Sequence, residues 1–139
     1  MDKNEAYAYL RIVEFPCTVA ELTQRIGLQP TEAWHAGDAA PLPRPPRKFN
    51  AWHLRSRLPT SEDVERHIVD VLDQVRGREA VLREVARDYG ITMECVGHFH
   101  EYYPGFALDA ETVRRLGECG ASIDLDFYHY FTEKQERDT

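Results

Sequence analysis

The chain has 139 residues, of which 42% are hydrophobic and 29% are charged, and its 24 acidic and 17 basic side chains give a formal net charge of -7. This composition is typical of a globular protein with one hydrophobic core, and it argues against a disordered, fibrous or membrane-spanning chain. The negative balance repels phosphate backbones, and no Lys/Arg stripe interleaved with aromatic residues offsets it. We therefore expect neither a nucleic acid nor a membrane as partner.

The N-terminal segment MDKNEAYAYL has neither the basic start nor the apolar run of a secretory signal, so we expect a cytoplasmic protein. Cys17, Cys95 and Cys119 show no CxxC or CxH spacing. This pattern predicts buried free thiols rather than disulfides or a structural zinc site. We expect a single domain over residues 1–139 that carries no cofactor.

The first predicted unit is a strand followed by a helix. From Ala6 to Phe15, small or aliphatic residues alternate with tyrosines and an arginine, which is typical of a strand with two different faces. Pro16 ends this strand. Thr18 and Glu21 have the spacing of a capping box, so we expect a short helix to start there, and Gly27 to end it.

A Pro-rich loop over about residues 36–48 separates this unit from the second strand. Its four prolines in residues 41–46 forbid a helix or an interior strand, and we expect a stiff surface loop rather than an SH3 ligand. The segment from Phe49 to Ser56 alternates again. It predicts a second strand, with Trp52 on the core side.

Two apolar stripes at helical spacing come next, from Val64 to Val75 and from Val81 to Tyr89, with Gly77 between them. They predict two consecutive helices or one kinked helix, and Asp63 is placed to cap the first.

The segment from Ile91 to Tyr103 predicts a third strand with one apolar face. Its other face carries His98, His100 and Tyr102, which is typical of the floor of a binding surface rather than of a core.

Pro104 and Gly105 predict a turn, and Asp109 has the position of a helix cap. The alternating segment from Ile123 to Phe131 predicts the last strand, before a charged tail over about residues 132–139 that we expect to be frayed.

This order of elements predicts an α+β fold. We expect four strands in a mainly antiparallel sheet with a ferredoxin-like, split β-α-β arrangement, an extra helical pair between the second and third strands, and all helices on one face. The other sheet face then stays uncovered. The residues that we expect to bind a ligand or partner on this open face, with Trp34 from the neighbouring loop, are Tyr9, Arg11, Trp34, His53, Arg55, His98, His100, Tyr102, Asp124, Asp126 and Tyr128.

Two pairs on this face have side chains that suit a transition metal, His98 with His100 and Asp124 with Asp126. A ferredoxin-like order separates the third and fourth strands by the first, which places the pairs roughly 9 to 10 Å apart. That distance is too large for most shared sites, so we expect no metal; if one binds, His98 and His100 are its candidate ligands. The objection disappears if the two strands are neighbours.

A histidine beside an aspartate also suits acid/base catalysis, although the sequence singles out no pair. GxSxG, P-loop, HExxH and GxGxxG motifs are absent from the sequence. The preferred hypothesis is therefore a non-catalytic module that binds a protein or a small molecule through the open face, with a basic partner favoured by the acidic balance. An enzyme that uses the same face and a homodimer in which two open faces pack together are the alternatives.

Three stretches, IGLQPTEAWHAGD, AWHLRS and LDAETVRRLGECGASIDLDFYHY, resemble in this order an uncharacterised, largely bacterial family, the domain of unknown function 4279. The resemblance covers nearly the whole chain and implies an α+β domain of about this length, but no reaction, cofactor or catalytic residue. Some small bacterial families of this kind look similar to immunity proteins that sequester a toxin, so an immunity role is an expectation by association.

Overall fold

A computed structural model describes residues 3–102 and 105–130 of the chain. The turn expected at Pro104, the end of the third predicted strand at Tyr103, and the charged tail over residues 132–139 lie outside the described residues. The described elements are, in chain order, β1 (Glu5–Val13), α1 (Val19–Ile26), β2 (Glu32–Trp34), β3 (Ala51–Arg55), α2 (Val64–Gln74), α3 (Glu79–Tyr89), β4 (Ile91–Phe99), α4 (Ala110–Glu118) and β5 (Ala121–His129).

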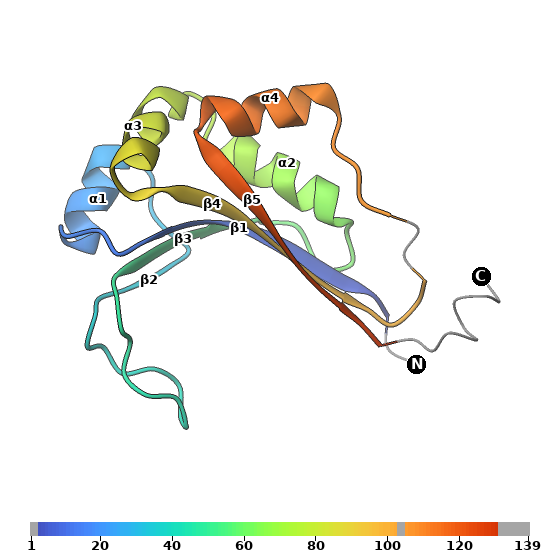
Figure 1. The fold of residues 1–139 in the computed structure, drawn as a ribbon, viewed down its shortest axis with the longest axis horizontal. Coiled ribbons are helices and arrows are strands. Elements are labelled where there is room, and N and C mark those ends of the chain that lie inside the picture. Colours follow the sequence, from blue (N-terminus) through green and yellow to red (C-terminus); the bar gives the residue numbers. More distant parts are fainter. Residues whose placement is uncertain (1–2, 103–104, 131–139) are drawn as a thin grey trace.

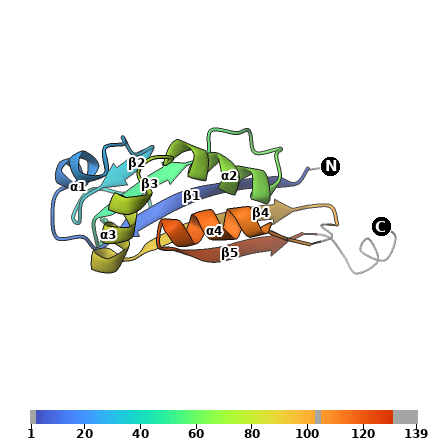
Figure 2. The ribbon, with the colours of Figure 1, turned by 90° about the horizontal axis from the view of Figure 1, so that it is seen from above.

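The strands form one mixed sheet in the order β2-β3-β1-β4-β5. The pairs β2 with β3, β3 with β1 and β1 with β4 are antiparallel, and β4 and β5 are parallel. The helices lie together on one face, where α2 packs against β1 and β4 and α4 packs against β5 (Figures 1 and 2). The α+β class and the one-sided helical layer agree with the prediction from the sequence.

The predicted four-stranded, ferredoxin-like arrangement is wrong in two respects. The sheet has a fifth strand, β2, which has three residues and is too short to show an alternating pattern. Because β2 and β3 form a hairpin around the Pro-rich loop, β3 enters the sheet antiparallel to β1. The third and fourth predicted strands, β4 and β5, are neighbours rather than separated by β1.

The hydrophobic core lies between the sheet and the helices. The inward side chains of β1, from Ala6 to Ile12 at every second position, are at most 4% exposed, and they meet α1 through Leu22 and Ile26. Trp52 on β3 is fully buried, as predicted, and its Nε1 donates a hydrogen bond to Thr23 Oγ1 at 3.1 Å. The Trp52 indole is thus buried with its N–H group hydrogen-bonded, and this contact joins α1 to the sheet.

The apolar face of β4 packs as its alternating sequence predicts, with Met93, Cys95 and Phe99 buried. Gly97 lies in this row because the Phe99 ring crosses its backbone. A Cβ atom at position 97 would stand 2.4 Å from the Phe99 ring and 3.2 Å from the Phe127 ring. The two phenylalanine rings meet edge to face, with centroids 5.2 Å apart.

Two of the three predicted helix caps form as expected. The Thr18 hydroxyl accepts a hydrogen bond from the Glu21 amide, and the Glu21 carboxylate accepts one from the Thr18 amide, each at 3.1 Å. Asp109 accepts from the Thr112 amide at 2.8 Å at the start of α4. Asp63 occupies the N-cap position of α2, but its side chain makes no capping hydrogen bond.

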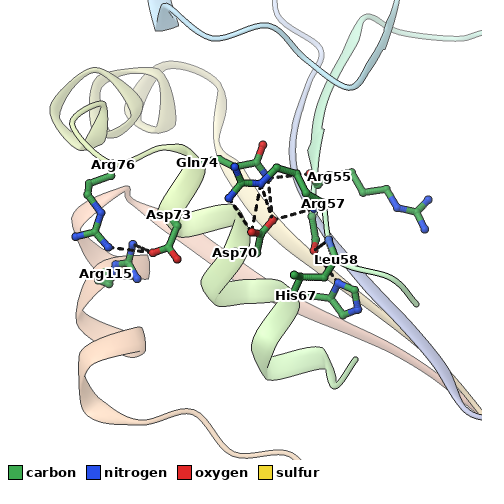
Figure 3. A network of polar contacts seen from close by, with 10 residues as sticks. Arg55, Arg57, Leu58, His67, Asp70, Asp73, Gln74, Arg76 and Arg115 are labelled. Atoms are coloured by element: carbon green, nitrogen blue, oxygen red, sulfur yellow. Dashed lines mark hydrogen bonds and ion pairs between the residues drawn. The ribbon is translucent and has the colours of Figure 1, made fainter. Parts of the chain in front are cut away.

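Carboxylates on α2 fix the helical layer (Figure 3). The nearly buried Asp70 accepts hydrogen bonds at 2.8 Å from both the backbone amide and the guanidinium group of Arg57, in the segment after β3. One turn further on, Asp73 accepts from Arg115 of α4 at 2.8 Å and from Arg76 at 3.0 Å. These contacts tie α2 to α4 and to the segment after β3, on the side of the sheet opposite the open face.

Candidate functional site

The strand registers determine which side chains share the open face of the sheet. Arg11 lies opposite His53 on β3, and Tyr9 lies opposite Glu94 on β4, which in turn lies opposite Asp124 on β5. Because side chains alternate along each strand, every second residue joins the same face. The main open-face residues are Tyr7, Tyr9, Arg11, Glu32, Trp34, His53, Arg55, Glu94, His98, Asp124, Asp126 and Tyr128.

The β2-β3-β1 half of this face is a cluster of rings and guanidinium groups. The Arg47 guanidinium group stacks on the Trp34 ring at 3.7 Å, and His53 meets the same indole edge to face at 5.0 Å. Tyr9 packs on the other side of His53, at 4.7 Å between ring centroids. Arg55 lies 4.0 Å over a further tyrosine ring of β1. We call this half the basic end.

His53 is held neutral within the basic end. Its Nδ1 lies 3.9 Å from the Glu32 carboxylate, which is too far for a direct hydrogen bond. Burial lowers the pKa of His53 to about 4, and the positive charges of Arg11 and Arg47 lower it as well. At neutral pH the imidazole therefore carries no charge, and positive charge at this end comes from the arginines.

The β4-β5 half carries carboxylates, and we call it the acidic end. Glu94 is nearly buried and shares a side-chain hydrogen bond with Asp124. Burial raises the pKa of Glu94, the Asp124 carboxylate raises it further, and Arg11, at 3.6 Å, only partly offsets the two. The ionised form of Glu94 is therefore disfavoured in the folded protein.

Four rings stack beside these carboxylates at the far end of β4 and β5, and we call them the ring stack: His98, Tyr128, Tyr130 and His100. The His98 ring lies nearly parallel to Tyr128, with centroids 5.0 Å apart, and its Nδ1 is 3.0 Å from the Tyr130 hydroxyl. The His100 ring stacks on Tyr130 at 4.6 Å. Tyr128 and Tyr130 remain 43% and 53% exposed, so solvent or a partner reaches the stack directly.

The hydroxyl of Tyr128 donates a hydrogen bond to Asp126 Oδ2 at 3.0 Å. This bond and the negative charge of Asp126 raise the pKa of the Tyr128 phenol. Asp126 therefore presents a carboxylate beside an exposed ring, an arrangement that suits a Lys or Arg side chain of a partner.

The structure brings the predicted site residues together in two groups rather than one. Five of them meet at the basic end, and His98, His100, Tyr128 and the two aspartates lie at the acidic end. Tyr102 is 41% exposed but lies beyond β4, which ends at Phe99 instead of continuing as predicted.

Three residues of the two ends were not among the binding residues predicted from the sequence: Glu94, Tyr130 and Arg47. Glu94 and Tyr130 could have been found, because the alternation of β4 and β5 already assigned them to the polar face. Arg47 follows the prolines in a segment without periodicity, so no pattern placed it over Trp34.

β4 and β5 are adjacent, so the His98/His100 and Asp124/Asp126 pairs are not separated by another strand, as the predicted strand order had implied. The register nevertheless places His98 opposite Tyr128, and Asp124 opposite Glu94. Among residues 3–102 and 105–130, no three His, Cys, Asp or Glu side chains converge as metal ligands.

The three cysteines are free thiols in this structure, and Cys95 and Cys119 are buried. Burial raises the pKa of Cys95 to about 12 and that of Cys119 to about 11. Since the thiolate is the reactive form, neither group is suited to nucleophilic chemistry at neutral pH.

Of the hollows on the described surface, two lie on opposite sides of the sheet near the residues discussed above. The one on the helical side, between α2 and the start of α4, has a volume of about 640 Å³ and includes Asp70, whose carboxylate already holds Arg57. A smaller hollow of about 290 Å³ lies beside the Pro-rich loop at the basic end, and its walls include Arg11 and Trp34.

None of the helices in the described part of the chain has the length and apolar character to cross a membrane. No curated protein and no solved structure matches the chain. The family model described as "Domain of unknown function (DUF4279)" matches residues 4–130, which is nearly the full length and agrees with the resemblance seen in the sequence. The chain therefore belongs to the DUF4279 family.

Proposed function

We propose that this protein is a non-catalytic binding module whose acidic end receives a basic segment of another protein. The observation that carries the proposal is the exposed ring stack beside aspartates that form no ion pair with a described cation. Among the described residues, no Lys or Arg forms an ion pair with Asp124 or Asp126. A Lys or Arg side chain that lies against Tyr128 would gain both a cation–π contact and an ion pair.

The outer edge of β5 supports the same proposal. β5 is the last strand of the sheet, and no described strand pairs with its outer backbone groups. On its other face, Ile123 and Leu125 are 41% and 45% exposed beside α4. An extended segment that alternates basic and apolar residues would continue the sheet, with its cations on the aspartates and its apolar side chains on Ile123 and Leu125.

The same edge argues against the dimeric alternative. If two copies of β5 paired antiparallel about Leu125, Asp124 of one copy would face Asp126 of the other. Like charges directly opposite each other destabilise a strand pair. A basic partner strand, in contrast, turns the same carboxylates into attractive contacts. An immunity protein that sequesters a toxin with a basic surface would be one form of this function.

Affinity capture tests the proposal with charge reversal at the acidic end. The protein and its Asp124→Lys/Asp126→Lys variant are immobilised and exposed to the native lysate, and captured proteins are identified by mass spectrometry. The matched control is Glu14→Lys/Glu84→Lys, which makes the same charge change at two exposed positions that form no ion pair with a described residue. We expect a basic protein that binds the wild type and the control, with at least about tenfold weaker affinity for the acidic-end variant. Equal binding to all three would contradict the proposal.

A second candidate, an acid/base enzyme, is favoured by one observation, the hydrogen-bonded carboxyl pair of Glu94 and Asp124. Such a pair holds a proton near neutral pH more readily than a single carboxyl group does. Incubating the captured partner with the wild type and with Glu94→Gln separates the two functions. Chemical conversion of the partner by the wild type alone would favour the enzyme, and an unchanged mass in both reactions would favour binding.

A further inference from the structure

The Pro-rich loop between β2 and β3 extends from the open side of the sheet, away from the helices (Figure 1). Its base is fixed by hydrogen bonds. The Gly37 amide donates to the Arg47 carbonyl and the Arg47 amide donates to the Asp38 carbonyl, each at 2.8 Å. The Asn50 side chain donates to the Phe15 carbonyl at 2.8 Å, which attaches the loop to the end of β1. With four prolines restricting its backbone, the loop is a preorganised wall.

The hollow of about 290 Å³ between this loop and the sheet, which we call the loop pocket, is strongly basic. None of the residues that line it is acidic, although acidic residues outnumber basic ones in the whole chain. The residues that define its chemistry are Arg11, Trp34, Arg44, Arg47, Lys48 and Phe49.

Three of the four positive charges of the loop pocket are not neutralised within the described protein. No described carboxylate forms an ion pair with Arg44, Arg47 or Lys48, and the contact of Arg11 with Glu94 is 3.6 Å long. Like charges that share a small hollow repel one another, so an anion entering it is attracted by several groups at once. Arg47 is already oriented by its stacking on Trp34, which reduces the entropy lost on binding.

His53, which meets Trp34 at the edge of the loop pocket, is exposed to the charges of the same arginines. Besides its burial, the charges of Arg11 and Arg47 lower the pKa of His53 to about 4. The titration of His53 is therefore sensitive to charge in the loop pocket, although burial is the larger cause of its lowered pKa.

We propose that the loop pocket binds a small organic anion, a carboxylate or phosphate attached to a flat ring. Guanidinium and ammonium groups bind the anionic group, and Phe49 with the Trp34–Arg47 stack provides flat surfaces for the ring. The volume of the pocket is near the lower end of the range for small-molecule sites, which fits one ring and its anionic group. This site is separate from the acidic end and takes a ligand of opposite charge.

Phenyl phosphate is a suitable probe, titrated into ¹⁵N-labelled protein and followed by NMR. We expect chemical-shift changes confined to the loop and the neighbouring ends of β1 and β3. Phenol should not bind, and inorganic phosphate should bind more weakly than phenyl phosphate because it lacks the ring. Binding of phenol as tight as that of phenyl phosphate would overturn the proposal, because the cations would then play no part.

Two double variants separate this site from general anion binding by surface cations. Arg44→Gln/Lys48→Gln changes two exposed groups of the pocket that take no part in the fold, and Arg66→Gln/Arg87→Gln removes two exposed charges from α2 and α3. We expect the pocket variant to weaken phenyl phosphate binding at least about tenfold and the control to change it less than twofold. Equal weakening by both variants, or no weakening by either, would overturn the proposal.

The titration of His53 gives a second readout at the site itself. The charged or titratable groups that face it are Glu32 of β2, Arg11 and Tyr9 of β1, and Arg47 of the loop. A bound anion should raise the pKa of His53 above about 4, measured by NMR of the imidazole nitrogens with and without phenyl phosphate. An unchanged pKa at saturating phenyl phosphate would place the anion elsewhere and overturn the assignment.

Discussion

The open face holds two titratable side chains whose ordinary charged forms the fold disfavours. Glu94 is nearly buried against Asp124, so its pKa is raised, whereas the buried imidazole of His53 beside Arg11 and Arg47 has its pKa lowered to about 4. Neither arrangement is required to close the core, which lies on the other side of the sheet. The raised pKa of Glu94 and the lowered pKa of His53 both mean that a charge on the open face lowers the stability of the fold, and this is the face for which we propose a function.

Replacing Glu94 by Gln should stabilise the protein at neutral pH. Because the pKa of Glu94 is raised on folding, its contribution to stability is present at low pH and is lost as the pH rises through the folded pKa. Gln keeps the shape without the charge, so we expect a gain of about 0.5 to 1 kcal/mol at pH 7.5 and little change at pH 4.

Urea unfolding at the two pH values measures the effect of Glu94→Gln, with the exposed Glu84→Gln as control. A loss of stability at pH 7.5 would mean that the contact between Arg11 and Glu94 outweighs burial and the repulsion from Asp124.

His53 should make stability depend on pH in the opposite sense. Its pKa falls from an ordinary value of 6.5 to about 4 on folding, so its contribution is present above pH 6.5 and is lost as the pH falls toward about 4. The effect is at most about 3 kcal/mol. We expect His53→Gln to flatten the decline in unfolding free energy across this window, measured by urea titrations at half-unit pH steps. A slope identical to that of the wild type would show that His53 is not the group responsible.

At the scale of the elements, short-range patterns predicted the local structure well. The capping box of Thr18 and Glu21 and the cap at Asp109 depend only on residues three positions apart, and both form. The alternation within β4 predicted both of its faces, since the period of two is intrinsic to a strand. The sequence did not predict β2, because three residues are too few to show an alternating pattern. It did not predict the stacking of Arg47 on Trp34, because this contact joins a strand to an irregular loop.

Substitution of Gly97 tests how tightly β4 and β5 pack around the Phe99 ring. A methyl group there would overlap the Phe99 ring, which is 1% exposed and has no free space to move into. We expect Gly97→Ala to destabilise the protein by about 1 to 3 kcal/mol through overpacking between β4 and β5.

The matched control is Gly117→Ala in α4, where an added Cβ meets no atom within 4 Å and alanine favours the helix. Thermal unfolding should therefore show a lower midpoint for Gly97→Ala and an equal or higher one for Gly117→Ala. A stable Gly97→Ala variant would mean that the Phe99 and Phe127 rings can repack.

At the scale of the whole molecule, the sequence predicted the α+β class and the helices on one face, but not the strand order. Which strands pair depends on contacts between distant segments, and the hairpin made by β2 and β3 reverses the direction that a simple β-α-β unit would give to β3. The wrong strand order did not change which residues were predicted for the open face, because side-chain alternation within a strand does not depend on which strand lies beside it. The two candidate sites, in contrast, could be separated only once the order β2-β3-β1-β4-β5 was known.

That order leaves β5 at the border of the sheet, nine residues long and with apolar side chains on one side. Bare strands of this kind polymerise readily, and natural proteins protect them with inward or flanking charges. By the same reasoning, Asp124 and Asp126 should protect this edge from association with other copies, independently of any partner. We therefore expect neutral replacements of Asp124 and Asp126 to lower the solubility of the protein, whereas lysine, which keeps a charge beside this edge, should preserve the solubility.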